Sequence, residues 1–163
     1  MVEVITPPSS LADRVVKGVG PDLQTIMARV EAGMETLKHQ YSDVLSSDLA
    51  ALDKALEKIK AETGELPTEA ATELYQAAHE IRGLAGSFDY PLLTGIAGSL
   101  CGFIDQLDSD LRPHIRVIEL QVGAMHAVVA NKITGGGGRQ GRELVASIGD
   151  LVTKALAEAG LDR

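Results

Sequence analysis

The sequence is short of several residue types, and each shortage excludes a class of protein. Tryptophan is absent, and aromatic residues make up only 3% of the 163 residues. A core of this composition has to be built from Leu, Ile, Val and Ala, which favours packed helices over a β-sandwich. The single cysteine, Cys101, excludes a disulfide framework and a cysteine-rich metal site, and we expect it to be a buried, unreactive thiol.

Basic residues are also in short supply. The chain has 15 Lys and Arg against 23 Asp and Glu, which gives a net charge of −8. A chain of this charge repels phosphate backbones, so we expect no nucleic-acid partner. The sequence has neither an apolar run of about 18 residues nor a charged and then apolar leader at its N-terminus. We therefore expect no membrane partner and a cytoplasmic location.

Hydrophobic residues, by contrast, form 45% of the chain, and their spacing is helical. Residues 1–21 are rich in proline, glycine and serine and are interpreted as a flexible N-terminal arm. From Leu23 to Ile59, apolar residues recur every three or four positions. This seam could break at Ser46–Asp48, so it predicts either one long first helix or an extra N-terminal helix before it.

Capping residues and prolines place the next helices. Thr68 is the expected N-cap of a second helix that runs to about Ser87, where Asp89-Tyr90-Pro91 ends it. A third helix follows, with an apolar face formed by Leu93, Ile96, Leu100, Ile104 and Leu107. Pro113 opens a fourth helix, and the residues of that helix predicted to turn inward are Ile115, Ile118, Val122, Met125 and Val129.

Glycines separate the last segment from the rest. Residues 133–142 are predicted to be a flexible Gly-rich linker, followed by an amphipathic C-terminal helix over 143–160. Its predicted inner residues are Leu144, Ile148, Leu151 and Ala155. We predict an all-α fold, with an antiparallel up-down four-helix bundle over residues 22–132 whose core covers about 42–132. The terminal helices could pack on this bundle or pair with a second copy of the chain as a homodimer.

Most of the reactive-looking features have a simpler explanation. The histidines show no metal-ligand spacing, so we expect no metal site. His39, His114 and His126 are interpreted as solvated and inert. The glycine run continues into Arg139-Gln140-Gly141-Arg142, without the Gly-Lys-Ser/Thr ending of a phosphate-binding loop. A linker is therefore the better interpretation of this run.

One histidine stands in a setting that core packing does not explain. At about 100° per residue, the helix around His79 buries one stripe of residues: Leu74, Ala77, Ala78, Ile81, Leu84, Ala85 and Phe88. His79 points to the opposite side of the helix, which faces solvent. The other residues predicted on this outer face are Thr72, Tyr75, Gln76, Arg82, Gly83 and Gly86.

Two glycines on this outer face have a cost that needs a reason. Gly83 and Gly86 each cost a helix about 1 kcal/mol relative to alanine. Because both are predicted to face solvent, their use would be to let another molecule approach the helix beside His79. Arg82, one turn after His79, offers a permanent positive charge to the same space. This combination suits a nucleophile that carries an anion.

The segment around this histidine also matches a known pattern. His79-Glu80-Ile81-Arg82-Gly83-Leu84-Ala85 resembles the signature of histidine phosphotransfer (HPt) domains: His, any residue, Leu or Ile, Lys or Arg, Gly, any residue, Ala or Ser. The continuation through Gly86 to Phe88 looks most like the phosphotransfer domain of chemotaxis-type histidine kinases.

The resemblance implies a role for each matching residue. His79 would be the phosphoacceptor, and Arg82 would offset charge on the phosphoryl oxygens. Gly83 would be the small position where a receiver docks, and Gly86 matches only the narrower chemotaxis-type pattern. Tyr75 and Gln76, on the same predicted outer face, would border the docking surface.

What the resemblance implies as a function is a phosphocarrier. A phosphoryl group would pass between His79 and an aspartate of a response-regulator receiver domain, or of a hybrid histidine kinase, in a two-component phosphorelay. The chain would hold no cofactor, because the Mg²⁺ belongs to the receiver. It would not be a self-sufficient kinase, since an ATP-binding domain needs about 130 further residues.

Two alternatives to the phosphocarrier come from other classes of protein. One is a helical-bundle adaptor that binds a receiver or another signalling protein without accepting phosphate. The other is a bundle that holds a metal or cofactor, which would need pairs of ligands on its inner faces. The predicted inner faces carry no such pairs.

Two further features bear on docking. The family usually has Gly ten residues after the histidine, where this chain has Asp89. Asp tolerates left-handed backbone geometry, so we expect the turn to survive, with an added charge that alters which receiver fits. The third predicted helix carries a stripe of small residues, which either permits close helix packing or extends the docking surface: Gly95, Gly98, Ser99 and Gly102.

Overall fold

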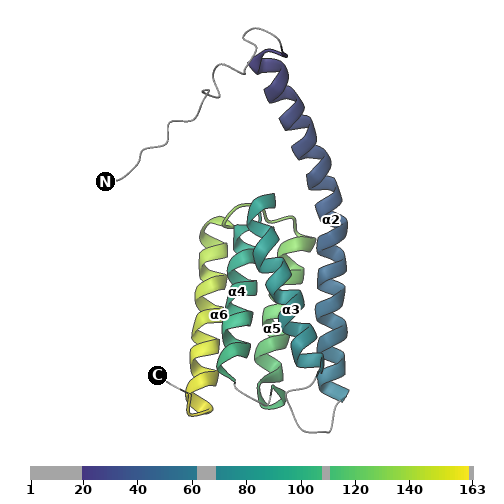
Figure 1. Cartoon of the computed structure of the whole chain (residues 1–163). Coiled ribbons are helices and arrows are strands. Elements are labelled where there is room, and N and C mark those ends of the chain that lie inside the picture. The colour runs from purple at the N-terminus through teal and green to yellow at the C-terminus, as the bar shows by residue number, and fades with distance from the viewer. Residues whose placement is uncertain (1–19, 62–68, 108–110, 162–163) are drawn as a thin grey trace, which may run out of the picture. The chain divides into compact units, whose positions relative to one another are not determined.

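The computed structural model describes residues 20–61, 69–107 and 111–161, and of residues 38–40 and 42 it describes the backbone only. Within these ranges every regular element is helical, which confirms the all-α prediction. The elements in chain order are α2 (Leu23–Ala61), α3 (Glu69–Leu84), the 3-10 helix η1 (Ala85–Phe88), α4 (Pro91–Gln106), the 3-10 helix η2 (Arg112–His114), α5 (Ile115–Ala130) and α6 (Gly138–Glu158) (Figure 1). The predicted N-cap Thr68, the side chain of His39, and residues 1–19 of the predicted arm lie outside the description.

The first apolar seam forms one helix rather than two. α2 continues through Ser46–Asp48 without a break, so the polar residues there do not interrupt the helix. It begins after Asp22, whose carboxylate accepts a hydrogen bond from the backbone N–H of Thr25 at 2.7 Å. The hydrogen bond from this backbone N–H also lowers the pKa of Asp22. This is the N-cap arrangement that satisfies an otherwise unpaired N–H group.

The chain divides into two compact units, Met1–Leu37 and Lys38–Arg163. In the first unit, the described part of α2 exposes between 42% and 73% of each of its large apolar side chains: Leu23, Ile26, Met27, Val30, Met34 and Leu37. Exposed apolar surface of this extent is typical of a surface that contacts another molecule.

The core of the second unit comes from the inner faces of its helices. α3, α4, α5, α6 and the part of α2 that belongs to this unit lie side by side (Figure 1). The fully buried side chains include Leu52, Leu74, Ile81, Leu100 and Ile118. Of the apolar positions predicted to face inward in the third and fourth helices, all are buried or half-buried.

The stripe predicted on the second helix is correct except at Leu84, and Ala85 beyond it is fully buried. Leu74 and Ile81 are fully buried, but Leu84 exposes 43% of its surface. The physical reason is that α3 ends at Leu84 and the chain tightens into η1. Phe88, at the end of η1, is half-buried against the core.

The C-terminal helix begins earlier than predicted. α6 starts at Gly138, so residues 138–142 of the predicted linker are helical. Gly137 has the left-handed φ of 64° and forms the N-cap. Gly141 is buried so close to the carbonyl of Gly136 that a Cβ there would overlap it. These glycines therefore serve a tight turn and a close backbone approach, which composition alone does not distinguish from a linker.

The inner face of α6 also differs by one residue from the prediction. Ile148 and Ala155 are buried as predicted. Leu151 is exposed, however, and Leu156 is buried instead. The face that α6 turns toward α4 and α5 is therefore set slightly around the helix from the predicted face.

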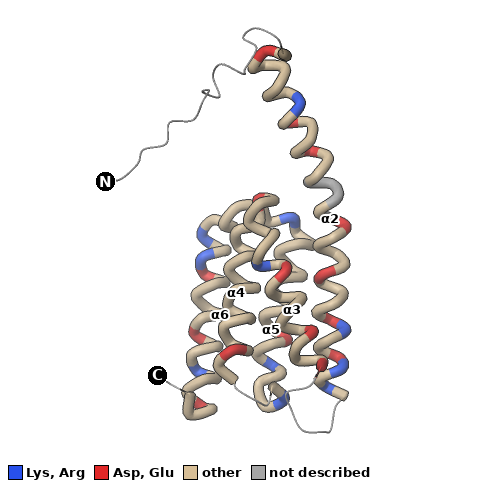
Figure 2. The backbone as a smooth tube through the Cα atoms, viewed as in Figure 1, with Lys and Arg blue, Asp and Glu red and all other residues tan. Residues whose placement is uncertain are grey.

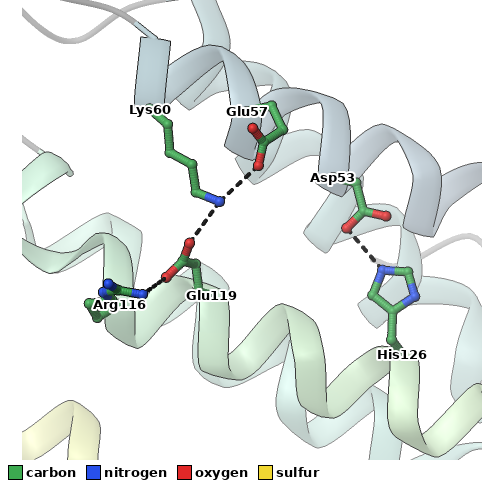
Figure 3. A network of polar contacts seen from close by, with 6 residues as sticks. All are labelled: Asp53, Glu57, Lys60, Arg116, Glu119 and His126. Carbon is green, nitrogen blue, oxygen red and sulfur yellow. Dashed lines mark hydrogen bonds and ion pairs between the residues drawn. The ribbon is translucent and has the colours of Figure 1, made fainter.

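Polar contacts join α2 to its neighbours at the surface. The ammonium of Lys60 lies 2.7 Å from the carboxylate of Glu119 on α5 (Figure 3). His126 on α5 lies 2.9 Å from the carboxylate of Asp53 on α2, so this histidine is paired rather than simply solvated as predicted. Each exposed pair of this kind contributes little stability. Lys58 makes a similar contact to α3.

Two features of the middle of the second unit stand out. α4 carries a single charged residue, Asp105, whereas charges are frequent along its neighbours (Figure 2). Gln121 on α5 is fully buried, and its amide atoms have no hydrogen-bond partner within the described residues.

Among the described helices, none is long and apolar enough to cross a membrane.

Candidate functional site

His79 lies on the exposed face of α3, as predicted. Ala78 and Ile81 on either side of it are fully buried, which fixes the helix face that His79 presents to solvent. The imidazole ring stacks on Tyr75, with ring centroids 6.1 Å apart and planes 25° from parallel. Tyr75 is half-buried and packs against the core. The ring of His79 therefore rests on an anchored aromatic side chain one turn earlier.

The stacking is the contact that the sequence analysis did not identify. Tyr75 was predicted to lie on the outer face and to border the docking surface, but not to stack on His79. An aromatic residue four positions before the histidine is a signal that could have found it, because residues four apart in a helix lie one above the other. Gln76, also predicted on this face, is exposed.

Arg82 is exposed, but its side chain extends toward α4 rather than lying free beside His79. Its Cδ atom lies 3.5 Å from the position that a Cβ at Gly98 would occupy. The positive charge of Arg82 also acts on Cys101 on α4. Burial raises the pKa of the Cys101 thiol, and the charge of Arg82 lowers it in part. The stem of Arg82 therefore passes over Gly98, where an added Cβ would make an ordinary van der Waals contact with it.

The small residues on α4 were predicted either to permit close helix packing or to extend the docking surface, and they differ in their surroundings. Gly98 faces the stem of Arg82, on the side where α4 contacts α3. Gly95 and Gly102 face open space, with nothing within 4 Å of an added Cβ. Ser99 is half-buried.

The two glycines after His79 also differ from each other. Gly83 is in the last turn of α3, is exposed, and has open space where a Cβ would project. Gly86 is not in α3 but in η1, and a Cβ there would meet the hydroxyl of Thr94 at 3.4 Å. Bare helical backbone beside His79 is therefore supplied by Gly83. Both glycines are exposed, as predicted, although Gly86 lies in η1 rather than in α3.

The turn after η1 keeps its geometry with Asp in place of the usual Gly. Asp89 adopts the left-handed conformation, with φ 67° and ψ 32°. Tyr90 donates its backbone N–H to the carbonyl of Ala85 at 3.0 Å, and Gly135 donates to the carbonyl of Asp89 at 2.7 Å. These hydrogen bonds hold the turn, which confirms the expectation that it survives.

Two carboxylates from α2 and α3, those of Asp48 and Glu80, interact with each other. Asp48 on α2 is half-buried, and one of its carboxylate oxygens is buried without a hydrogen-bond partner among the described residues. Burial raises the pKa of Asp48, and the charge of Glu80, which adjoins His79 in sequence, raises it further. The ionised form of Asp48 is therefore disfavoured in the folded chain.

We predict that Asp48→Asn stabilises the protein at pH 7. The pKa of Asp48 is higher in the folded chain than in the unfolded chain, where it is 3.8. Above both pKa values the ionised carboxylate lowers the free energy of unfolding, and below pH 3.8 it is protonated in both states and has no such effect. The melting temperature at pH 7 should rise by about 2–4 °C, the shift that roughly 1 kcal/mol produces in a chain of this size. The gain should shrink as the pH is lowered toward 3.8.

Thermal melts by circular dichroism at several pH values measure this effect. Asp150→Asn, on the exposed face of α6, is the matched control and should leave the melting temperature unchanged at every pH. A gain from Asp48→Asn that is the same at low and neutral pH would contradict the assigned cause.

The remaining reactive side chains have structural surroundings. Cys101 is fully buried, and burial raises the pKa of its thiol, which confirms the expectation of a buried cysteine. His114 is half-buried and packs edge-on against Phe103, with centroids 5.8 Å apart. Within the described part of the chain, no group of three or more His, Cys, Asp or Glu side chains is placed to hold a metal ion.

Comparison of the chain with family models, with curated proteins and with solved structures found no match. The candidate site accordingly stands on its own geometry. That geometry is an exposed imidazole on a rigid helix, stacked on a tyrosine and followed by open glycine backbone, with a guanidinium on the side toward α4.

Proposed function

We propose that this chain is a histidine phosphotransfer protein, which relays a phosphoryl group between His79 and an aspartate of a response-regulator receiver domain. The observation that carries the proposal is the exposed imidazole of His79 next to the open backbone at Gly83. A buried histidine could not meet a globular partner, and a bulky residue at position 83 would keep the partner's aspartate away. The resemblance of the surrounding segment to the HPt signature supports the same assignment.

The proposed architecture is the antiparallel up-down four-helix bundle of that family, formed by α3, α4, α5 and the part of α2 in the second unit. The continuous core shared by these helices supports it. The connection from α3 to α4 consists only of η1, Asp89 and Tyr90, and short connections favour antiparallel neighbours. α6 packs on α4 and α5 as an addition to this arrangement.

The proposed reaction requires only one reacting group from this chain, the imidazole of His79. Neutral imidazole is a competent nucleophile near pH 7. A ring nitrogen of His79 forms a bond to phosphorus while the bond from phosphorus to the aspartyl oxygen breaks, and the carboxylate leaves with the electron pair. The resemblance to HPt domains implies that the attacking atom is the nitrogen farther from the backbone. The other ring nitrogen then releases its proton to solvent.

The residues around His79 would position the reaction rather than perform it. Tyr75 limits the orientations of the imidazole by stacking on it, which reduces the entropy lost when the reacting atoms align. Arg82 would place positive charge at the edge of the phosphoryl group from the side of α4. The Mg²⁺ and most of the charge stabilisation would come from the receiver. A separate kinase would have to supply the phosphoryl group.

A phosphotransfer profile tests this function. The chain is incubated with a panel of phosphorylated receiver domains, and transfer of label to the chain is followed over time. We expect rapid transfer from at least one receiver, and the label on the chain should be lost in acid and stable in alkali, as phosphohistidine is. A receiver that binds the chain without transferring its label would instead favour the non-phosphorylated adaptor.

A further inference from the structure

A cavity of about 250 Å³ lies in the second unit, where α2, η1 and the segment after α5 meet. Its walls are largely aromatic and aliphatic, from Tyr41, Phe88, Tyr90, Leu45 and Val129. The chain has only five phenylalanine and tyrosine residues, and three of them line this cavity. An engineered apolar cavity of about 150 Å³ binds benzene, so this volume accommodates a six-membered ring with a small polar group attached.

A buried hydroxyl at this cavity has no partner. Tyr41 is 5% exposed, and its ring stacks on Phe88 with centroids 3.9 Å apart. Its hydroxyl is buried without a hydrogen-bond partner among the described residues. Burial raises the pKa of Tyr41 to about 12, so the group is a neutral donor at neutral pH. A buried donor of this kind is normally satisfied, and the described residues supply no acceptor for it.

Two residues of opposite charge line this cavity, and the backbone of each has a strained, left-handed conformation. In the described chain, Asp89 and Lys132 are the two non-glycine residues with left-handed φ, at 67° and 50°, and both line the cavity. Each follows the end of a helix, a position that usually carries glycine because glycine has no steric cost there. Among the described residues, neither side chain has an ion-pair partner. Strained residues of this kind cluster at ligand-binding sites.

We propose that this cavity binds a small zwitterion with an apolar side chain, such as an α-amino acid that carries a single ring. The ring would occupy the apolar part of the cavity beside Phe88. The carboxylate of the ligand would pair with the ammonium of Lys132, and its ammonium with the carboxylate of Asp89. Side chains of opposite sign, without ion-pair partners among the described residues, would explain why glycine is not used at either position.

The inference does not rest on phosphotransfer, and its test uses direct binding. The probes are L-phenylalanine, 3-phenylpropanoate, which lacks the ammonium group, and phenethylamine, which lacks the carboxylate. Because the chain has no tryptophan and two of its three tyrosines line the cavity, tyrosine fluorescence reports on binding. We expect saturable binding of phenylalanine, about tenfold tighter than that of either truncated probe, as one charge-assisted contact is lost in each.

Glycine variants separate binding from folding. Lys132→Gly should weaken phenylalanine binding about tenfold, to the affinity of phenethylamine. It should also raise the melting temperature by about 2–4 °C, because glycine relieves the left-handed backbone. Asp89→Gly should likewise weaken phenylalanine binding about tenfold, to the affinity of 3-phenylpropanoate. Lys154→Gly, on the exposed face of α6, is the control and should leave binding unchanged.

Two results would overturn the proposal. One is the absence of saturable binding of all three probes to the wild-type chain. The other is a Lys132→Gly variant that is folded and binds phenylalanine as tightly as the wild type. Neither result would bear on labelling of His79, so the proposed function and this inference fail independently.

Discussion

Replacing His79 by glutamine is expected to abolish phosphotransfer to this chain from every phosphorylated receiver that labels the wild type. Glutamine retains a polar side chain of similar length, but its amide nitrogen has no free electron pair to attack phosphorus. His79 is exposed, and exposed substitutions of this kind usually change stability by less than about 0.5 kcal/mol. The loss should therefore be chemical rather than structural. The label on the chain measures phosphotransfer, and the circular dichroism melt measures the stability of the fold.

A second histidine provides the matched control. His126 is also partly exposed on a helix, and its ring is paired with Asp53. His126→Gln should leave labelling by the receiver unchanged, with at most a small loss of stability. Labelling of His79→Gln at the wild-type rate would end the assignment of this residue. Loss of labelling in both variants would mean that the assay reports on the fold rather than on one imidazole.

Leucine at position 83 is expected to lower the rate of phosphotransfer by at least about a hundredfold, which corresponds to roughly 2.7 kcal/mol. Nothing lies within 4 Å of an added Cβ at Gly83, so the side chain would project into the space that a docked receiver needs. The same change should stabilise the free protein by up to about 1 kcal/mol, because leucine favours the helix and glycine does not. Activity and stability should thus move in opposite directions.

Gly149→Leu separates docking from helix propensity. Gly149 lies on the exposed face of α6, where an added Cβ also meets nothing within 4 Å. This variant should gain similar stability and retain the wild-type rate of transfer. A Gly83→Leu variant that is phosphorylated at the wild-type rate would show that the receiver does not approach this part of α3. The proposed docking surface would then be wrong even if His79 accepts phosphate.

Helical spacing in the sequence was sufficient to place His79 on the solvent side of its helix. Leu74 and Ile81 are buried as predicted, and the direction of His79 follows from theirs because successive residues turn by a constant angle. The same spacing failed at Leu84, the last residue of α3, although it held at Ala85 and Gly86 in η1. The left-handed turn at Asp89 was expected from the tolerance of Asp for that geometry.

Two features of the fold could not be predicted from the local sequence. The glycines at 137 and 141 have the composition of a linker, yet they form the tight start of α6 because Gly136 and Gly141 approach each other closely. Ser46–Asp48 has the composition of a helix break, yet α2 continues through it. In both places the packing of neighbouring segments outweighs the preference of the residues themselves.

The periodicity of apolar residues was enough to identify an all-helical chain with an exposed histidine, since each of these properties depends on neighbours within about one helical turn. The stem of Arg82 over Gly98, and the cavity that joins Tyr41 to Lys132, could not be predicted in this way. They bring together residues from different helices, and no local pattern records how those helices are placed against one another.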